Sequence, residues 1–182
     1  MIRAKGKVIW ITGLPGSGKS VIAGALQKIR PRLVVLKMDE LRKIATPKPS
    51  YSETEREIIY RSLVYTAKTL SDLGHDVAID ATGNLRRWRE LARSEMSPFA
   101  EVYLKCPLEI SMEREKKRSR RRGAPAGIYA KAKKGWPVPG VSAPYEEPQN
   151  PELVIETDRT GIMESARQID SLLRRLAKRR QG

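Results

Sequence analysis

The sequence predicts an α/β fold in which helices cover both faces of a five-stranded parallel sheet. Short apolar, β-branched runs alternate along the chain with longer amphipathic stretches, which is the strand and helix pattern of such folds. The short runs are apolar at consecutive positions, as expected for strands that are buried on both faces. With 182 residues, of which 40% are hydrophobic, residues 1–182 are expected to form a single domain.

The alternation assigns five strands and five helices. The longest helix has end signals, because Ser52 and Glu55 form a capping-box pattern before an apolar stripe and Gly74 follows the stripe. The expected strands are residues 7–12, 33–38, 76–80, 99–105 and 153–156. The expected helices are residues 19–29, 53–73, 86–95, 108–122 and 161–179.

A long segment between the last two helices breaks this pattern. Residues 123–150 lack regular periodicity and are rich in Gly, Pro and Lys. Segments of this length inside a compact domain are usually functional lids or disordered. We therefore expect a basic lid over about residues 114–147.

The positive charge of the chain is concentrated in two stretches. Lys and Arg number 36 against 21 Asp and Glu, a formal net charge of +15. Residues 113–134 contribute +8 of this charge and residues 172–182 contribute +5. Such stretches are either solvated surfaces or attract polyphosphates and nucleic acid. The sequence leaves both interpretations open, and nucleic acid is one candidate partner.

Cysteine content and hydropathy indicate the cellular compartment of the chain. The single cysteine, Cys106, cannot form an intrachain disulfide, and this fits a reducing, cytoplasmic compartment. The early apolar run at residues 8–11 is too short for a signal-peptide core or a membrane-spanning helix. We expect a cytoplasmic protein with no membrane partner.

A phosphate-binding motif follows the first expected strand. It fits G-x-x-x-x-G-K-[ST] and opens the first expected helix, as in the P-loop NTPase fold. Glycines allow backbone N–H groups to point at a phosphate, and the helix N-terminus adds favourable partial charge. We expect Lys19 to reach the β and γ phosphates of ATP and Ser20 to ligate Mg²⁺. The predicted ATP-binding residues are Gly13, Leu14, Pro15, Gly16, Ser17, Gly18, Lys19 and Ser20.

Two aspartates stand where expected strands end. Asp39 follows the second strand and Asp80 closes the third, at the sheet edge where open α/β sheets bind ligands. Asp39 can accept the proton of an acceptor hydroxyl, Arg42 can hold an anionic acceptor, and Asp80 can support Mg²⁺. Helix caps for both aspartates and a surface position for Arg42 are the alternatives.

The chain resembles the adenylylsulfate kinase family over residues 6–173. The resemblance rests on the P-loop, the element Asp39-x-x-Arg42, and two lid segments. Residues 127–135 read G-I-Y-A-K-A-K-K-G and residues 143–154 read A-P-Y-E-E-P-Q-N-P-E-L-V. The family transfers the γ-phosphate of ATP to the 3′-hydroxyl of adenosine 5′-phosphosulfate.

The resemblance implies roles for individual residues. Asp39 matches the presumed catalytic aspartate and Arg42 the arginine of the same element. Tyr51 matches an aromatic residue that stacks on the substrate adenine, and Arg56 a substrate-binding arginine. Lys134, with Lys131, would belong to the lid. The resemblance also implies a homodimer.

Several positions on the acceptor side depart from the family pattern. Residues 81–84 read A-T-G-N instead of F-I-S-P, and Ile59 replaces a substrate-binding asparagine. Val138 replaces the lid phenylalanine, so Trp136 is the candidate for the second stacking ring. Lys37, Met38 and Glu40 also differ. A related P-loop kinase with another acceptor, such as a small hydroxyl compound or a polynucleotide end, is the alternative, and a non-catalytic nucleotide-binding module is a third.

Overall fold

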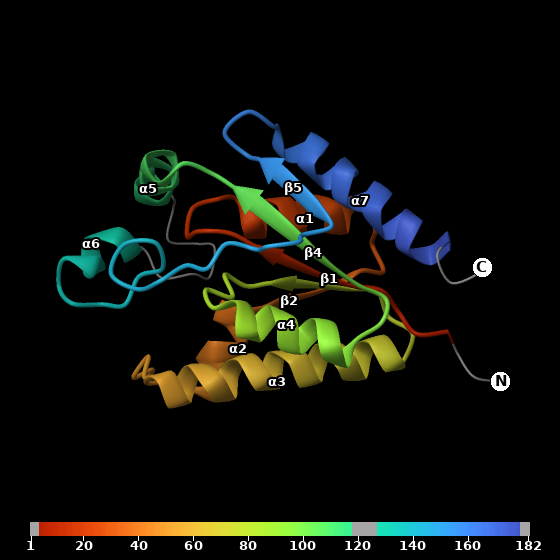
Figure 1. The fold of residues 1–182 in the computed structure, drawn as a ribbon, viewed down its shortest axis with the longest axis horizontal. Coiled ribbons are helices and arrows are strands. Elements are labelled where there is room, and N and C mark those ends of the chain that lie inside the picture. Colours follow the sequence, from red (N-terminus) through yellow and green to blue (C-terminus); the bar gives the residue numbers. More distant parts are fainter. Residues whose placement is uncertain (1–3, 118–126, 179–182) are drawn as a thin grey trace.

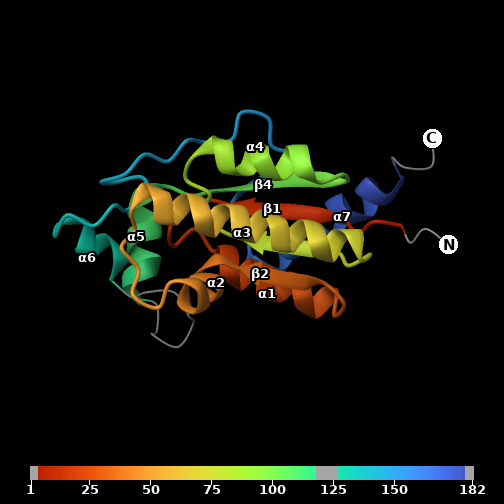
Figure 2. The same ribbon diagram turned by 90° about the horizontal axis from the view of Figure 1, so that it is seen from below.

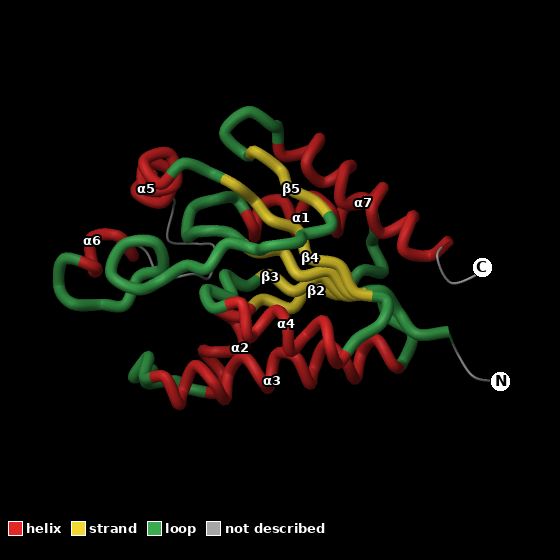
Figure 3. Tube along the Cα trace, in the orientation of Figure 1, coloured by secondary structure: helices red, strands yellow, loops and turns green. Residues whose placement is uncertain are grey.

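A computed structural model describes residues 4–117 and 127–178 of the chain. Its centre is a sheet of five parallel strands in the order β2-β3-β1-β4-β5 (Figures 1 and 3). The strands are β1 (Val8–Thr12), β2 (Val34–Lys37), β3 (Val77–Asp80), β4 (Phe99–Lys105) and β5 (Leu153–Glu156). The predicted parallel α/β fold is therefore confirmed.

Helices cover the two faces of this sheet. Helices α1 (Lys19–Ile29) and α7 (Ile162–Lys178) pack on one face, and α3 (Glu53–Asp72) and α4 (Arg86–Glu95) pack on the other. Figure 2 shows α3 running along the sheet between α4 and α2 (Met38–Ala45). Helices α5 (Leu108–Lys117) and α6 (Ile128–Ala132) lie together beyond the carboxyl ends of the strands (Figure 1).

Alternating side chains of the central strand divide the core in two. Ile9 and Ile11 face α1 and α7, whereas Val8 and Trp10 face α3 and α4. All five residues of β1 are buried, which explains why this strand reads as a continuous apolar run rather than an alternating one. Burial of the central strand fixes its register and therefore the position of the loop that follows it.

Every predicted boundary that falls on described residues is confirmed to within one residue, and the short helices α2 and α6 are additional. The strand expected at residues 33–38 ends at Lys37, because Met38 already begins α2. The lid region expected to lack regular structure contains the short helix α6. Residues 118–122 of the expected fourth helix, residue 179 of the last one, and residues 118–126 of the lid lie outside the described residues. No helix within the described ranges is long and apolar enough to cross a membrane.

Candidate active site

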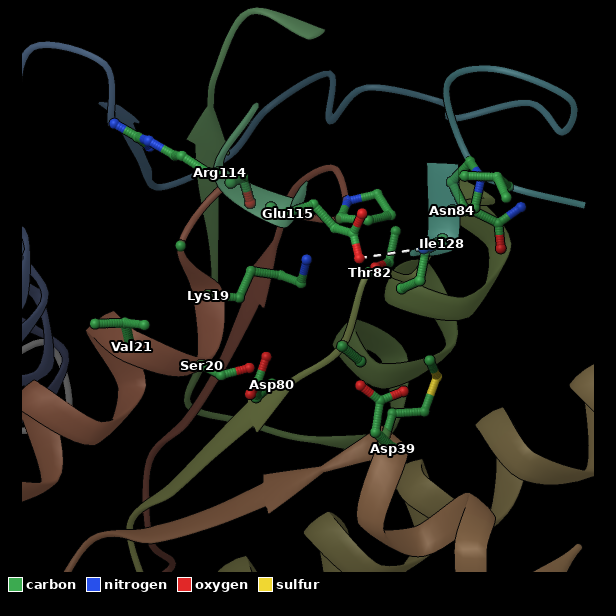
Figure 4. A pocket seen from close by; sticks show the side chains of 18 of the residues that line it. Lys19, Ser20, Val21, Asp39, Asp80, Thr82, Asn84, Arg114, Glu115 and Ile128 are labelled. Atoms are coloured by element: carbon green, nitrogen blue, oxygen red, sulfur yellow. Dashed lines mark hydrogen bonds between the residues drawn. The ribbon is translucent and has the colours of Figure 1, made fainter. Parts of the chain in front are cut away.

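A cavity of about 900 Å³ opens at the carboxyl edge of the sheet. Its wall combines the P-loop, the start of α2, the N-terminal part of α3, the loop after β3, α5, the lid and the segment after β5 (Figure 4). The predicted site residues among its lining are Pro15, Gly16, Ser17, Gly18, Lys19, Ser20, Asp39, Arg42, Tyr51, Arg56 and Asp80. Residues from distant parts of the chain thus meet in one space.

The P-loop adopts a conformation that depends on its glycines. Gly16 and Gly18 have φ angles of 86° and 104°, in the left-handed region that favours glycine. A Cβ at Gly16 would lie 2.1 Å from the carbonyl oxygen of Ser111 in α5, so this position also needs the missing side chain. The loop is therefore packed directly against α5, which leads into the lid.

The P-loop lysine contacts its own loop. Lys19 Nζ donates hydrogen bonds to the carbonyl oxygens of Gly13 at 2.9 Å and Leu14 at 3.0 Å. These carbonyls anchor the long side chain while its ammonium group stays at the cavity wall. Gly13 and Leu14 themselves do not line the cavity, and they contribute through this anchoring.

Oxygen groups suited to Mg²⁺ gather beside the P-loop. The Ser20 side chain hydrogen-bonds to Asp80, and Asp39 faces the pair from the start of α2 (Figure 4). Burial raises the pKa of Asp80, while the ammonium group of Lys19 and the Ser20 hydrogen bond oppose this. Mg²⁺ in kinases is usually held by one or two such oxygen ligands together with substrate phosphates. Residues 4–117 and 127–178 contain no cluster of three or more His, Cys, Asp or Glu that would bind a metal without phosphate.

Arg42 lies at the cavity wall but is already paired. Its Nη1 atom lies 2.7 Å from Glu55 Oε1, and the side chains of both residues are about nine-tenths buried. Its guanidinium carbon also lies 5.0 Å from the centroid of the Tyr51 ring. Arg42 therefore presents an ion pair to the cavity rather than a lone cation.

The predicted capping box is only half formed. The Ser52 hydroxyl accepts a hydrogen bond from Glu55 N at 3.2 Å and caps α3, as expected. The Glu55 carboxylate instead accepts from the backbone N–H groups of Ser50 and Tyr51. Tyr51 has a positive φ of 55°, and these bonds hold the strained turn that places its ring beside Arg42.

Lid residues close over the aromatic side of the cavity. The rings of Tyr51 and Trp136 are in contact, with centroids 4.9 Å apart and planes inclined by 53°. Lys131 Nζ lies 4.6 Å from the Trp136 ring, and Arg56 donates to the Pro137 carbonyl oxygen at 3.1 Å. A base between two parallel rings needs about 7 Å between them, since each stacking contact takes about 3.5 Å. The two rings are closer than that and must separate to admit a base.

The remaining predicted residue lies elsewhere. Lys134 is exposed just after α6 and does not line the cavity. Arg114 of α5 also lines the cavity. It donates to the carbonyl oxygen of Thr157 at 2.8 Å and so fixes the segment after β5.

Sequence reasoning missed several lining residues. Thr157 and the residues up to Ile162 follow the last strand, and no motif marks them. Glu115 and Tyr60 also line the cavity. Both belong to amphipathic helices, where an inward side chain at helical spacing looks like an ordinary core position. Only the assembled fold reveals that they reach the site.

Comparisons with known proteins match this geometry. Residues 5–156 match the family model described as adenylylsulphate kinase. A protein of Archaeoglobus fulgidus named probable adenylyl-sulfate kinase is 39% identical over 158 residues, covering 84% of this chain and 96% of that protein. A protein of Halalkalibacterium halodurans with the same name is 36% identical over 180 residues, covering 94% and 84%.

Solved structures agree with the sequence comparison. The adenylylsulfate kinase CysC of Mycobacterium tuberculosis, solved with AMPPNP and adenylyl sulfate, has a TM-score of 0.79 and 33% identity, covering 93% of this chain and 98% of that one. A gluconokinase from Sinorhizobium meliloti, at 19% identity and a TM-score of 0.65, shares the fold alone. The chain therefore belongs to the adenylylsulfate kinase family of P-loop kinases.

Proposed function

We propose that this protein transfers the γ-phosphate of ATP to the 3′-hydroxyl of adenylyl sulfate, giving 3′-phosphoadenylyl sulfate. The observation that carries the proposal is that Asp39, the Ser20–Asp80 pair and the P-loop face one another across a single cavity. The cavity also reaches the aromatic pair of Tyr51 and Trp136, which offers stacking surfaces to a nucleobase. Donor and acceptor nucleotides thus have separate ends of one site.

The donor half would neutralise charge on the transferred group. Phosphoryl transfer depends mainly on positioning and on neutralising the negative oxygens. Lys19 and the backbone amides of the P-loop supply positive charge to the β and γ phosphates. Ser20 and Asp80 are the residues that would hold Mg²⁺, which supplies further charge neutralisation when bound.

The acceptor half would activate and orient a hydroxyl. Asp39 lies at the start of α2, opposite Ser20 and Asp80, where its carboxylate can accept the hydroxyl proton as phosphate transfers (Figure 4). Tyr51 and Trp136 would stack on the adenine after their rings separate. Arg56 would bring positive charge to the anionic group of the acceptor, with Lys134 approaching from the lid. Arg42 would add to this charge once the bound anion draws it away from Glu55.

The test is ADP release from Mg-ATP with and without adenylyl sulfate. We expect clear stimulation by adenylyl sulfate in the native protein. Asp39→Asn should lower kcat by about 10²- to 10⁴-fold while nucleotide binding stays unchanged. Glu40→Gln is the matched control, because Glu40 lies beside Asp39 but pairs with Lys37 at 2.8 Å outside the cavity lining. Absence of stimulation by adenylyl sulfate would reject this acceptor.

Three further expectations remain predictions. A homodimer is implied by family resemblance and is tested by sedimentation equilibrium. A nucleic-acid partner rests on the basic stretches at residues 113–134 and 172–182, and filter binding of an oligonucleotide at low and high salt tests it. A cytoplasmic location rests on cysteine content, and fractionation of the source cells tests it.

A further inference from the structure

Tyr60 is a buried tyrosine that contributes to the wall of the cavity. It lies on α3 and is about 3% exposed, with its ring packed against Trp88 at a centroid distance of 5.1 Å and Trp10 at 6.2 Å. Despite this burial, Tyr60 lines the cavity. Its side chain therefore belongs both to the core and to the wall of the site.

The Tyr60 hydroxyl is positioned by backbone groups of the 81–84 loop. Its oxygen accepts a hydrogen bond from Gly83 N at 3.1 Å and a second from the backbone of Asn84. A backbone N–H can only donate, so these bonds leave the hydrogen of the hydroxyl uncommitted. Across residues 4–117 and 127–178, no group accepts that hydrogen. Burial raises the pKa of Tyr60, so the hydroxyl keeps its hydrogen at neutral pH.

The 81–84 loop itself is held firmly. Trp10 Nε1 donates to the Ala81 carbonyl oxygen at 2.9 Å, and Thr12 Oγ1 donates to the Thr82 carbonyl oxygen at 2.5 Å. Arg89 donates to the Gly83 carbonyl oxygen. Because its partner loop is fixed at three carbonyls, the Tyr60 hydroxyl is held in place before any substrate arrives.

The surroundings place this hydroxyl in the acceptor half of the cavity. The charges of Arg42 and Arg56 both act on it, and Thr82 and Asn84 of its partner loop also line the cavity. The preceding residue, Ile59, is fully buried and does not line the cavity. Of these two neighbouring residues of α3, only Tyr60 offers a polar group to a ligand, one turn after Arg56.

We propose that Tyr60 is a specificity-determining residue whose hydroxyl donates a hydrogen bond to an oxygen or ring nitrogen of the acceptor nucleotide. This inference rests on the proposed function. A site that holds a buried donor in place discriminates against ligands that cannot accept from it, because the donor is then left unpaired. One neutral hydrogen bond corresponds to about a fivefold change in affinity.

The experiment measures KM for adenylyl sulfate, KM for ATP and kcat in four proteins. Tyr60→Phe removes the hydroxyl and keeps the ring. Tyr65→Phe is the matched control on the same helix, since Tyr65 is 72% exposed. Trp10→Phe removes a different hydrogen bond to the same loop and part of the packing against the Tyr60 ring, so it reports on displacement of the loop and the ring with the Tyr60 hydroxyl still present. Thermal unfolding of each variant checks that it folds.

The expected result is about a fivefold rise in KM for adenylyl sulfate in Tyr60→Phe, with KM for ATP and kcat within twofold of the native protein. Tyr65→Phe and Trp10→Phe should keep the native KM for adenylyl sulfate. An unchanged KM in Tyr60→Phe, or an equal rise in Trp10→Phe, overturns the inference. If the native protein shows no stimulation by adenylyl sulfate, the proposed function fails instead, and the inference fails with it.

Discussion

Replacing Gly16 by alanine tests whether the P-loop is fitted to α5. The new Cβ would lie 2.1 Å from the Ser111 carbonyl oxygen and 2.9 Å from its carbon, closer than such contacts allow. The φ of 86° adds the strain of a left-handed conformation for a residue with a side chain. Left-handed strain costs about 1–2 kcal/mol and overpacking about 1–3 kcal/mol. We expect Gly16→Ala to lose about 2–5 kcal/mol of unfolding free energy.

Two other glycines separate the components of this effect. Gly18 has a φ of 104° but its nearest heavy atom would be 3.5 Å from the new Cβ, so Gly18→Ala carries the strain without the clash. Gly24 lies within α1, with no atom within 4 Å of a new Cβ. Gly24→Ala should therefore stabilise the protein by up to about 1 kcal/mol, as expected for glycine replaced inside a helix.

The assay combines thermal unfolding with calorimetric titration of ADP. For a chain of this size, 1 kcal/mol shifts Tm by about 2–4 °C, so Gly16→Ala should lower Tm by about 4–20 °C. Gly18→Ala should lower it less, and Gly24→Ala should raise it. ADP affinity should fall in the first two variants and stay unchanged in the third. A Gly16→Ala protein with native Tm and native ADP affinity would refute the reasoning.

The remaining predictions concern the metal side, the aromatic pair and the lid. Burial raises the pKa of Asp80, so the folded protein holds this proton more tightly than the unfolded chain, and its stability falls as pH rises above about 4. An asparagine at this position has no proton to lose. The Tm of Asp80→Asn minus the Tm of the native protein should therefore be larger at pH 7 than at pH 4. Adenylyl sulfate should change tryptophan fluorescence, because it separates Trp136 from Tyr51, whereas Trp10 and Trp88 are buried. The Tyr129 hydroxyl in α6 donates a hydrogen bond to the carbonyl oxygen of Pro15 in the P-loop at 2.7 Å. Tyr129→Phe removes this bond to the phosphate-binding loop and should raise KM for ATP about fivefold.

Each of these predictions has a control. Asp72→Asn is the control for the pH effect, because hydrogen bonds from Lys5 and Lys68 lower the pKa of Asp72, so this variant should not gain Tm over the native protein from pH 4 to pH 7. The fluorescence response should vanish in Trp136→Phe, and a response that persists there would assign it to another tryptophan. Tyr65→Phe controls for loss of a hydroxyl far from the P-loop, and equal KM values for ATP in both Phe variants would contradict a role for Tyr129.

The sequence predicts those parts of the site that depend on neighbouring residues. The P-loop is a short segment whose glycines, lysine and serine act through local backbone geometry, so one motif locates it. Asp39 and Asp80 are predictable because strand ends of a parallel sheet share one edge. The alternation of strands and helices is likewise a local pattern, which is why most boundaries are confirmed.

Contacts between segments that are distant in sequence do not follow from such local patterns. The sequence predicts that Arg42 holds an anion but gives no sign of its pair with Glu55, thirteen residues away, which forms because α2 and α3 pack side by side. Trp136 touches Tyr51 across 85 positions of sequence, and no periodicity links them. Side-chain pairing of this kind is decided by how the elements pack, so it emerges only with the complete fold.

Packing also decides which departures from the family pattern reach a ligand. Lys37 and Glu40 pair with each other 2.8 Å apart, with side chains 41% and 56% exposed, and neither lines the cavity. Met38 and Val138 do line it, as do residues of the 81–84 loop. The changes at the solvated pair can therefore leave acceptor binding intact, whereas the changes at the wall alter the shape and polarity that an acceptor meets. Any difference in acceptor preference between this protein and its relatives should follow exchanges at the wall and be insensitive to exchanges at the solvated pair.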